Sequence, residues 1–162
     1  MSQSLMDQHF FGFNDLVIKG TFFGPGGMIT PEGGYAVRVT NKTGVATVKG
    51  KLAECSESVD NAVALAGAGD TECVGVFYDA GVADGDECWI VWGGIADVLL
   101  DDDVSAVHGN WMATGAAEGY ARTATSPAAS PQHFQEIGHC LESVSATGGG
   151  THILAKCMIH LL

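Results

Sequence analysis

The stretch of residues 74–100 constrains the fold most, because it holds two consecutive strand patterns joined by a turn signal. Residues 74–78 and 87–92 are rich in β-branched and aromatic side chains, which favour extended backbone. The Asp-Gly pair at 84–85 is typical of a turn, since glycine tolerates the positive φ that a tight turn needs. The sequence therefore predicts a hairpin with a turn longer than two residues. A Gly-Gly pair then breaks the second strand, which resumes over residues 95–100.

A weaker copy of this stretch lies near the C-terminus. Residues 74–79 (VGVFYD) align with residues 137–142 (IGHCLE), and a glycine and a long strand pattern follow in both copies. Upstream, residues 48–53 (VKGKLA) resemble residues 107–113 (VHGNWMA). A period of about 60 residues in only two copies argues against a solenoid, which needs three or more stacked repeats. We expect two related β half-motifs, although a chance likeness between two glycine-rich segments stays open.

The composition favours an all-β fold with little helix. The chain has 23 glycines among 162 residues, and only 16% of its residues are charged, which suits short strands and tight turns better than long helices. We expect a compact, glycine-rich β-barrel or β-sandwich built from two tandem half-motifs at about residues 44–100 and 104–162. These would form a single β domain at residues 35–162, preceded by an extended N-terminal arm at residues 1–34.

Weaker patterns complete the expected strands. Residues 35–40 alternate in polarity and are expected to form a hairpin with residues 45–52. Residues 56–66 have helical spacing but are short enough for a strand, so both assignments stay open. Residues 121–132 are small and polar, which indicates an exposed loop. The alternation is cleanest in residues 152–162, which we expect to pair inside a sheet or with a neighbouring subunit.

The N-terminal segment is unusual in its phenylalanines. Five of the seven in the chain lie within residues 1–34, among glycine- and proline-containing turns. Clustered phenylalanines are costly to expose to water, so this segment should either dock on a fixed partner or pack on its own domain. The predicted docking residues are the apolar ones of this arm: Phe10, Phe11, Phe13, Leu16, Val17, Ile18, Phe22 and Phe23.

The charge of the chain argues against nucleic acid as a partner. Its 19 acidic residues and 7 lysines and arginines give a net charge of −12, and no basic cluster occurs. Nucleic-acid affinity comes mostly from lysine and arginine on phosphates, so we expect no nucleic-acid partner. No apolar run approaches the roughly 20 residues of a membrane-spanning helix, and the N-terminus lacks a signal-peptide pattern. We expect synthesis in a cytoplasm and no membrane partner.

No residue pattern predicts catalysis, a cofactor or a metal site. The six histidines lack the spacings of zinc sites, and His139 and Cys140, as neighbours in a strand, should point to opposite faces. The Asp triplet at 101–103 lacks the alternating ligands of a calcium loop and indicates a solvated turn. The five cysteines include no CxxC pair, which favours reduced, buried thiols, while a disulfide between two of them stays open. We therefore expect no enzyme, no cofactor and no bound metal.

The order of these motifs resembles that of the small capsid decoration proteins of tailed bacteriophages, also called head-stabilising or cement proteins. Their tandem half-motifs run as aliphatic-Gly-x-x-x-acid, a glycine turn, a long strand and Gly-aliphatic-x-x-aliphatic. The match covers about residues 44–162, leaves out the phenylalanine-rich arm, and is interrupted by an insert at residues 125–135. The residues that carry it are Val74-Gly75 to Asp79, Gly85, residues 87–92 and Gly94-Ile95 to Leu99 in the first copy, and Ile137-Gly138 to Glu142 and residues 151–162 in the second.

The resemblance implies a compact β fold, usually trimeric, on the outer surface of a virion. Such a homotrimer would bind the major capsid protein at local threefold positions and stabilise the shell. It also implies an N-terminal arm that adds backbone to a coat-protein strand, which fits the docking arm expected at residues 1–34. Two alternatives stay open. One is another virion part, such as a head fibre base or a tail protein, and the other is a small trimeric β-fold enzyme with carboxylates at subunit interfaces.

Overall fold

The computed structural model describes residues 22–23, 26–126 and 132–160 of the chain. Within them the all-β prediction is confirmed: eleven strands form one connected sheet, accompanied by one short 3-10 helix, η2 (Gln132–Gln135). The strands are β1 (Phe22–Phe23), β2 (Gly27–Ile29), β3 (Gly34–Asn41), β4 (Leu52–Cys55), β5 (Ala62–Leu65), β6 (Cys73–Phe77), β7 (Glu87–Leu99), β8 (Trp111–Thr114), β9 (Ala121–Ala124), β10 (Glu136–Cys140) and β11 (Leu154–His160).

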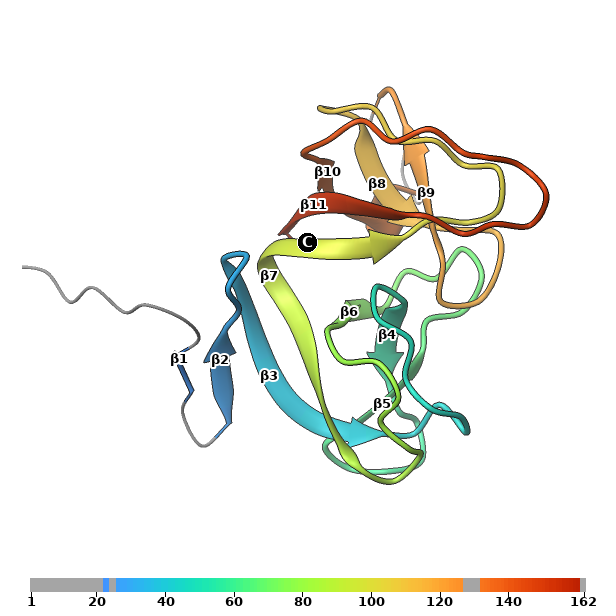
Figure 1. Ribbon diagram of the computed structural model, residues 1–162. Coiled ribbons are helices and arrows are strands. Elements are labelled where there is room, and N and C mark those ends of the chain that lie inside the picture. Colours follow the sequence, from blue (N-terminus) through green and yellow to red (C-terminus); the bar gives the residue numbers. More distant parts are fainter. Residues whose placement is uncertain (1–21, 24–25, 127–131, 161–162) are drawn as a thin grey trace, which may run out of the picture.

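Five strands close into a barrel in the first half of the chain. β3, β5, β4, β6 and β7 neighbour one another in this order, and the ring closes because β3 pairs with both β5 and β7 (Figure 1). Closure pairs the backbone groups that an open sheet would leave at its edges. The interior is filled by inward-facing side chains of these strands, namely Ala53, Val63, Phe77, Cys88 and Ile90.

The 13-residue strand β7 connects this barrel to the rest of the sheet. Residues 87–94 of this strand pair with β3, residues 90–91 also pair with β6, and residues 93–99 pair with β11. The strand bends at Gly94, whose φ is +78°, and a Cβ at this position would meet the carbonyl oxygen of Gly33. The expected break after residue 92 is therefore wrong. The glycines bend the strand without ending it (Figure 1).

The second half of the chain repeats the strand pairing of the first. β4 pairs with β5 and β6, and β6 pairs with β7. Likewise β8 pairs with β9 and β10, and β10 pairs with β11. The β4–β6 and β8–β10 ladders even skip one residue at the same place. The matched partners are Leu52↔Val76, Ala53↔Gly75 and Glu54↔Cys73 in the first half, and Trp111↔His139, Met112↔Gly138 and Ala113↔Glu136 in the second.

A parallel contact closes the second half into an equivalent ring. In the first half Asn41 of β3 pairs with Val63 of β5 in parallel. In the same place of the second half, a parallel bridge joins Leu100, which follows β7, to Ala121 of β9. The second half of β7 therefore has the role in the second ring that β3 has in the first.

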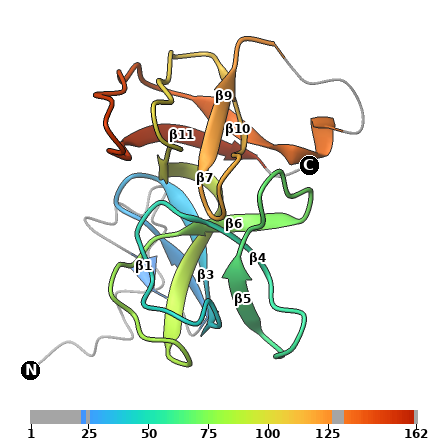
Figure 2. The ribbon, with the colours of Figure 1, turned by 90° about the vertical axis from the view of Figure 1, so that its right-hand side faces the viewer.

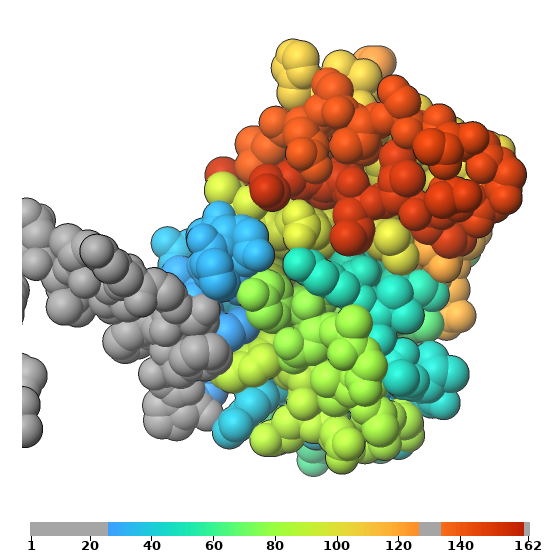
Figure 3. Space-filling model, viewed as in Figure 1, coloured from blue at the N-terminus to red at the C-terminus, as the bar shows by residue number. Residues whose placement is uncertain are grey.

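The chain thus folds into two stacked units that share β7. Residues 34–92 form the first unit, and the described residues between 93 and 160 form the second (Figure 2). The two are packed against each other over a broad contact (Figure 3), and one cluster of buried side chains runs through both. The units begin upstream of the half-motifs expected at about residues 44–100 and 104–162, because each ring takes its first strand from further back in the chain.

The glycine and the acid of the sequence motif have the same structural roles in both units. A Cβ at Gly75 or at Gly138 would meet a backbone carbonyl oxygen of the adjacent strand, so glycine permits the close approach of the two strands. The acid then caps the strand that follows. The backbone N–H of Trp89 donates to Asp79 Oδ2 at 2.9 Å, and that of Lys156 donates to Glu142 Oε1 at 2.7 Å.

Two expectations for individual segments need correction, and one open alternative is decided. Residues 45–52 do not form a hairpin with β3, because closure of the barrel gives both sides of β3 to other strands and leaves residues 42–51 as a loop. Residues 121–124, expected in an exposed loop, form β9. Residues 56–66 were open between helix and strand, and their second part is β5. The terminal strand prediction is confirmed, since β11 pairs on both sides and buries Ala155, Cys157 and Ile159.

Part of the arm expected at residues 1–34 belongs to the sheet. β1 pairs with β2, and β2 pairs with β3, so this segment extends the sheet beyond the first barrel. Met28 and Thr30 are buried, and Thr30 Oγ1 accepts a hydrogen bond from the backbone N–H of Gly34. The described residues from 26 onward are therefore anchored to the first unit.

We predict that Gly138→Ala lowers the free energy of unfolding by about 1–3 kcal/mol, because the new methyl group would press on the backbone of β11. Gly67→Ala is the matched control: nothing lies within 4 Å of its Cβ position, and we expect a change within about 0.5 kcal/mol. Urea unfolding followed by circular dichroism measures both. Equal stabilities for the two variants would contradict the close approach of β10 and β11.

Candidate docking surface

The predicted docking residues lie at one end of the sheet order. Phe22 and Phe23 form β1, which in the described residues pairs with β2 alone. An end strand of this kind presents backbone N–H and C=O groups that can pair with another chain. The other predicted docking residues lie outside the described residues: Phe10, Phe11, Phe13, Leu16, Val17 and Ile18.

An apolar groove opens beside this end of the sheet, and we call it the edge groove. It has a volume of about 390 Å³ and is formed by β2, the start of β3 and the middle of β7. Three large apolar side chains in it are exposed: Ile29 at 43%, Tyr35 at 52% and Trp92 at 50%. The rings of Tyr35 and Trp92 lie 6.3 Å apart. Contiguous exposed apolar groups of this size are typical of interaction surfaces.

A second groove opens at one end of the first barrel, and we call it the mouth groove. Its volume is about 470 Å³, and it lies next to the edge groove, since Val37 and Trp92 line both. Most of its lining is apolar, with polar groups from the turn between β4 and β5. The lining residues are Val37, Val39, Cys55, Ser56, Val59, Asp60, Asn61, Ala62, Val63, Val74, Ile90 and Trp92.

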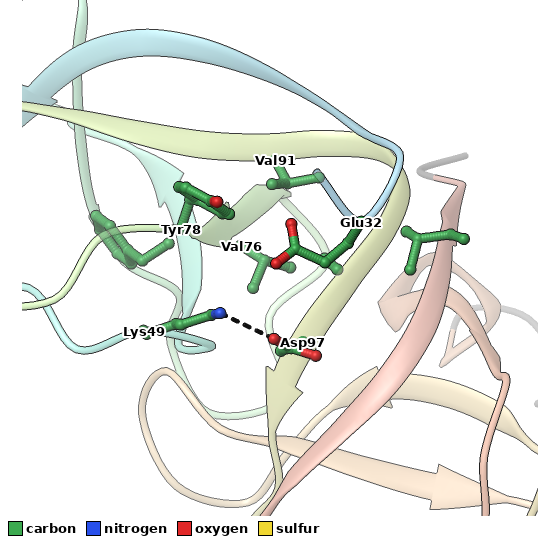
Figure 4. Close-up of a pocket in the computed structure, with 9 residues that line it drawn as sticks. Glu32, Lys49, Val76, Tyr78, Val91 and Asp97 are labelled. Carbon is green, nitrogen blue, oxygen red and sulfur yellow. Dashed lines mark ion pairs between the residues drawn. The ribbon is translucent and has the colours of Figure 1, made fainter. Parts of the chain in front are cut away.

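A small cavity between the units is lined mostly by apolar atoms, with an ion pair at its wall (Figure 4). Lys49 Nζ forms an ion pair with Asp97 Oδ2 at 2.9 Å, and the Lys49 ammonium lies 5.5 Å from the centre of the Tyr78 ring. Its hydrogen bond to Asp97 raises the pKa of Lys49, and the carboxylate of Glu32 acts in the same direction. The cavity has a volume of about 10 Å³, roughly one water molecule. This arrangement joins the two units and has no room for a substrate.

Two histidines that the sequence analysis did not connect meet on the outer side of the second unit. His139 Nδ1 and His160 Nε2 lie 2.7 Å apart, and the ring of Trp111 packs 4.1 Å from that of His139. The sequence does not predict this pair, because His139 and His160 lie on different strands and are brought together only by the pairing of β10 with β11. Among the described residues no group of three or more His, Cys, Asp and Glu side chains could hold a metal ion.

The cysteines divide into one exposed thiol and four that are partly or fully buried. Cys55 is exposed in the mouth groove, which differs from the expectation of buried thiols. Burial raises the pKa of Cys73 to about 12 and that of Cys88 to about 11. Cys140 and Cys157 are ladder partners inside the second barrel, and contact with Cys140 raises the pKa of Cys157. Cys140 is buried while His139 faces outward, as strand alternation predicts.

Comparison with known proteins adds no assignment. No family model matches the chain, and no curated protein matches its sequence. In the part of the chain that the structure describes, no helix has the length and apolar character needed to cross a membrane. The surfaces described above are therefore the basis for any functional proposal.

The Lys49–Asp97 pair should stabilise the contact between the units up to alkaline pH. The pKa of Lys49 is raised in the folded state, so its contribution is complete below the ordinary value of 10.5 and disappears as the pH rises through the raised value. We expect Lys49→Met to cost about 0.5–1 kcal/mol at neutral pH, since both groups are partly exposed. Urea unfolding of Lys49→Met, Asp97→Asn and the double variant measures this coupling. Additive effects of the two substitutions would contradict it.

We predict that in dilute solution, at about pH 8, only Cys55 reacts rapidly with a thiol reagent. Cys73, Cys88, Cys140 and Cys157 should react at least about tenfold more slowly, because burial restricts access of the reagent to these sulfurs and also raises the pKa of Cys73 and Cys88. Mass spectrometry of the labelled peptides assigns each rate, and Cys55→Ser should remove the fast phase. Rapid labelling of Cys140 or Cys157 in the folded protein would contradict the closed second barrel.

Proposed function

We propose that this protein is a capsid decoration protein of a tailed bacteriophage. It binds the major capsid protein at local threefold positions on the outside of the shell, as a homotrimer, and stabilises the shell. The observation that carries the proposal is the duplicated unit. The glycine and acid of the motif on which the resemblance rests occupy matching positions in two rings with the same strand pairing.

The docking element in this proposal is the N-terminal arm that leads into β1. The edge of β1 that does not pair with β2 would pair with a coat-protein strand, while the phenylalanines upstream would anchor it in apolar pockets. Residues 1–21 would span at most about 75 Å if fully extended, so they could contact a surface well beyond the β domain. Weak contacts made by each copy would add up on a symmetric shell.

The character of the described surface supports a structural role over an enzymatic one. The cavity between the units has a volume of about 10 Å³, too little for a substrate, and the two large grooves are mostly apolar. The net charge of −12 would repel the protein from DNA and from anionic membranes. In this proposal the protein needs no cofactor and acts on the outer surface of the virion.

The test is co-sedimentation with purified mature heads of a phage whose genome encodes the chain. We predict that the full-length protein binds at a fixed number of copies per head. Deletion of residues 1–21 should abolish binding, and the triple variant Phe10→Ser, Phe11→Ser, Phe13→Ser should weaken it at least about tenfold. Val107→Ser is the control, because Val107 is an exposed apolar residue of the second unit.

Two results would contradict the proposal. Absence of the full-length protein from the head pellet would exclude capsid decoration. Its recovery with purified tails, and not with heads, would favour the other class of virion part.

A further inference from the structure

The mouth of the second barrel is covered, whereas that of the first is open. Strand pairing assigns each residue of the mouth groove a counterpart in the second unit. The ladder pair Val37–Ile90 of the first unit corresponds to the pair Ala96–Cys157 of the second. The pair Val39–Cys88 corresponds in the same way to Val98–Ala155. Val37, Val39 and Val74 are partly exposed and Trp92 is 50% exposed, while their counterparts are buried. These counterparts are Ala96, Val98, Ile137 and Ile159.

The first unit supplies the cover of the second barrel. Gly69 N–H donates to the carbonyl of Gly115, and Thr114 Oγ1 donates to the carbonyl of Asp70, each at 2.8 Å. Thr114 and Gly115 are the counterparts of Cys55 and Ser56, which line the open mouth groove.

A second group of hydrogen bonds holds the first unit over the mouth of the second barrel. Leu52 N–H donates to the carbonyl of Gly119, and Gly119 N–H donates to the carbonyl of Ala66. Gly119 is the counterpart of Asn61, another residue of the mouth groove, and both have a positive φ. The start of β4 and the turn after β5 therefore cap the second barrel.

The second unit carries its own version of this covering face, and there it is exposed. In the first unit the face is buried and consists of Leu52, Ala66, Val76 and Val91. The counterparts in the second unit are Trp111, Ala124, His139 and Met158, of which Met158 is 39% exposed and the others are partly exposed. We call these four residues the outer face. Tryptophan and methionine are enriched at protein interfaces, where they fill apolar pockets.

We propose that a second copy of this chain docks its outer face on the mouth groove, so that the contact between the two units within a chain recurs between chains. The contact is head-to-tail, because each chain offers one outer face and one mouth groove, which are different surfaces. Head-to-tail contacts close into rings when the rotation permits it. A ring of three copies would be the trimer of the proposed function, but the contact itself does not depend on capsid binding.

The β1–β2 ribbon makes the contact between chains differ from the one within a chain. In the first unit, β2 pairs with the start of β3 and occupies the space beside it. At the equivalent place beside the second unit there is no such strand among the described residues, and Val76, Val91 and Ala96 line the small cavity between the units. His139 and Met158 of the second copy would therefore lie beside the ribbon, against the edge groove. Ile29, Tyr35 and Trp92 provide the exposed apolar surface that this arrangement needs.

The test measures oligomeric mass and the labelling of Cys55, which lies in the mouth groove. With the full-length protein, we expect a multiple of the chain mass in sedimentation. The Cys55 labelling rate should fall at least about fivefold as the concentration rises from about 1 µM to about 100 µM. Trp92→Glu damages the groove and Met158→Glu damages the outer face, so each should be monomeric alone. Val107→Glu is the control, because its counterpart Val48 stays 45% exposed although the units are packed.

A mixing experiment identifies the head-to-tail geometry. The Met158→Glu variant keeps an intact mouth groove, and the Trp92→Glu variant keeps an intact outer face. Excess Trp92→Glu protein should therefore bind Met158→Glu protein and slow the labelling of Cys55 in the latter. The complex should contain no more than two chains, because its two remaining surfaces are both damaged. Circular dichroism and thermal melting show whether each variant is folded. Should a variant unfold, the concentration dependence of Cys55 labelling in the unmodified chain still decides the matter.

Three outcomes would overturn the proposal. One is a full-length monomer whose Cys55 labels at the same rate at every concentration. Another is an unchanged mass in both folded variants. The third is a monomer in which deletion of residues 1–21 uncovers Cys55, since the groove would then hold the N-terminal segment of its own chain. Failure of head binding alone would leave this contact intact and contradict only the proposed function.

Discussion

The bend of β7 at Gly94 is the constraint on which the rest of the structure depends. Before the bend the strand closes the first ring against β3 and β6, and after it the strand opens the second ring against β11. The backbone of Gly33 approaches Gly94 so closely that a side chain would not fit. Since both rings take a strand from β7, the bend also sets how the units are stacked. It thereby determines which barrel mouth is covered and which is left open.

The two units show how one strand scheme can serve two purposes. Phe77 and Ile90 meet inside the first barrel, and the smaller pair Cys140 and Cys157 occupies the same place in the second. The larger differences lie outside the barrels. The face with which the first unit covers the second unit is made of buried aliphatic residues. The second unit carries Trp111, His139 and Met158 at the matching positions, on its surface. Under the proposed function, this combination of a repeated frame and a varied exterior would serve assembly with further copies and with a coat protein.

The sequence predicts the parts of this fold that depend on local pattern. The hairpin of β6 and β7, the alternation of β11 and the likeness between residues 74–79 and 137–142 were visible because turn residues and polarity periods act over short distances. Closure of the barrel was not, since the parallel contact of Asn41 with Val63 joins strands that no local signal relates. The same limit explains the false hairpin at residues 45–52. The grooves could not be predicted for a further reason. Alternation of polarity distinguishes the two faces of a strand, but it does not show which of these faces is covered by the other unit.

The most direct test of the central claim, a duplicated β unit that assembles on a phage shell, is an electron cryomicroscopy map of mature heads with and without the protein. We expect added density at the local threefold positions, with two lobes from each of three copies arranged head-to-tail around the axis. Density elsewhere on the particle, or a single lobe per copy, would contradict the claim.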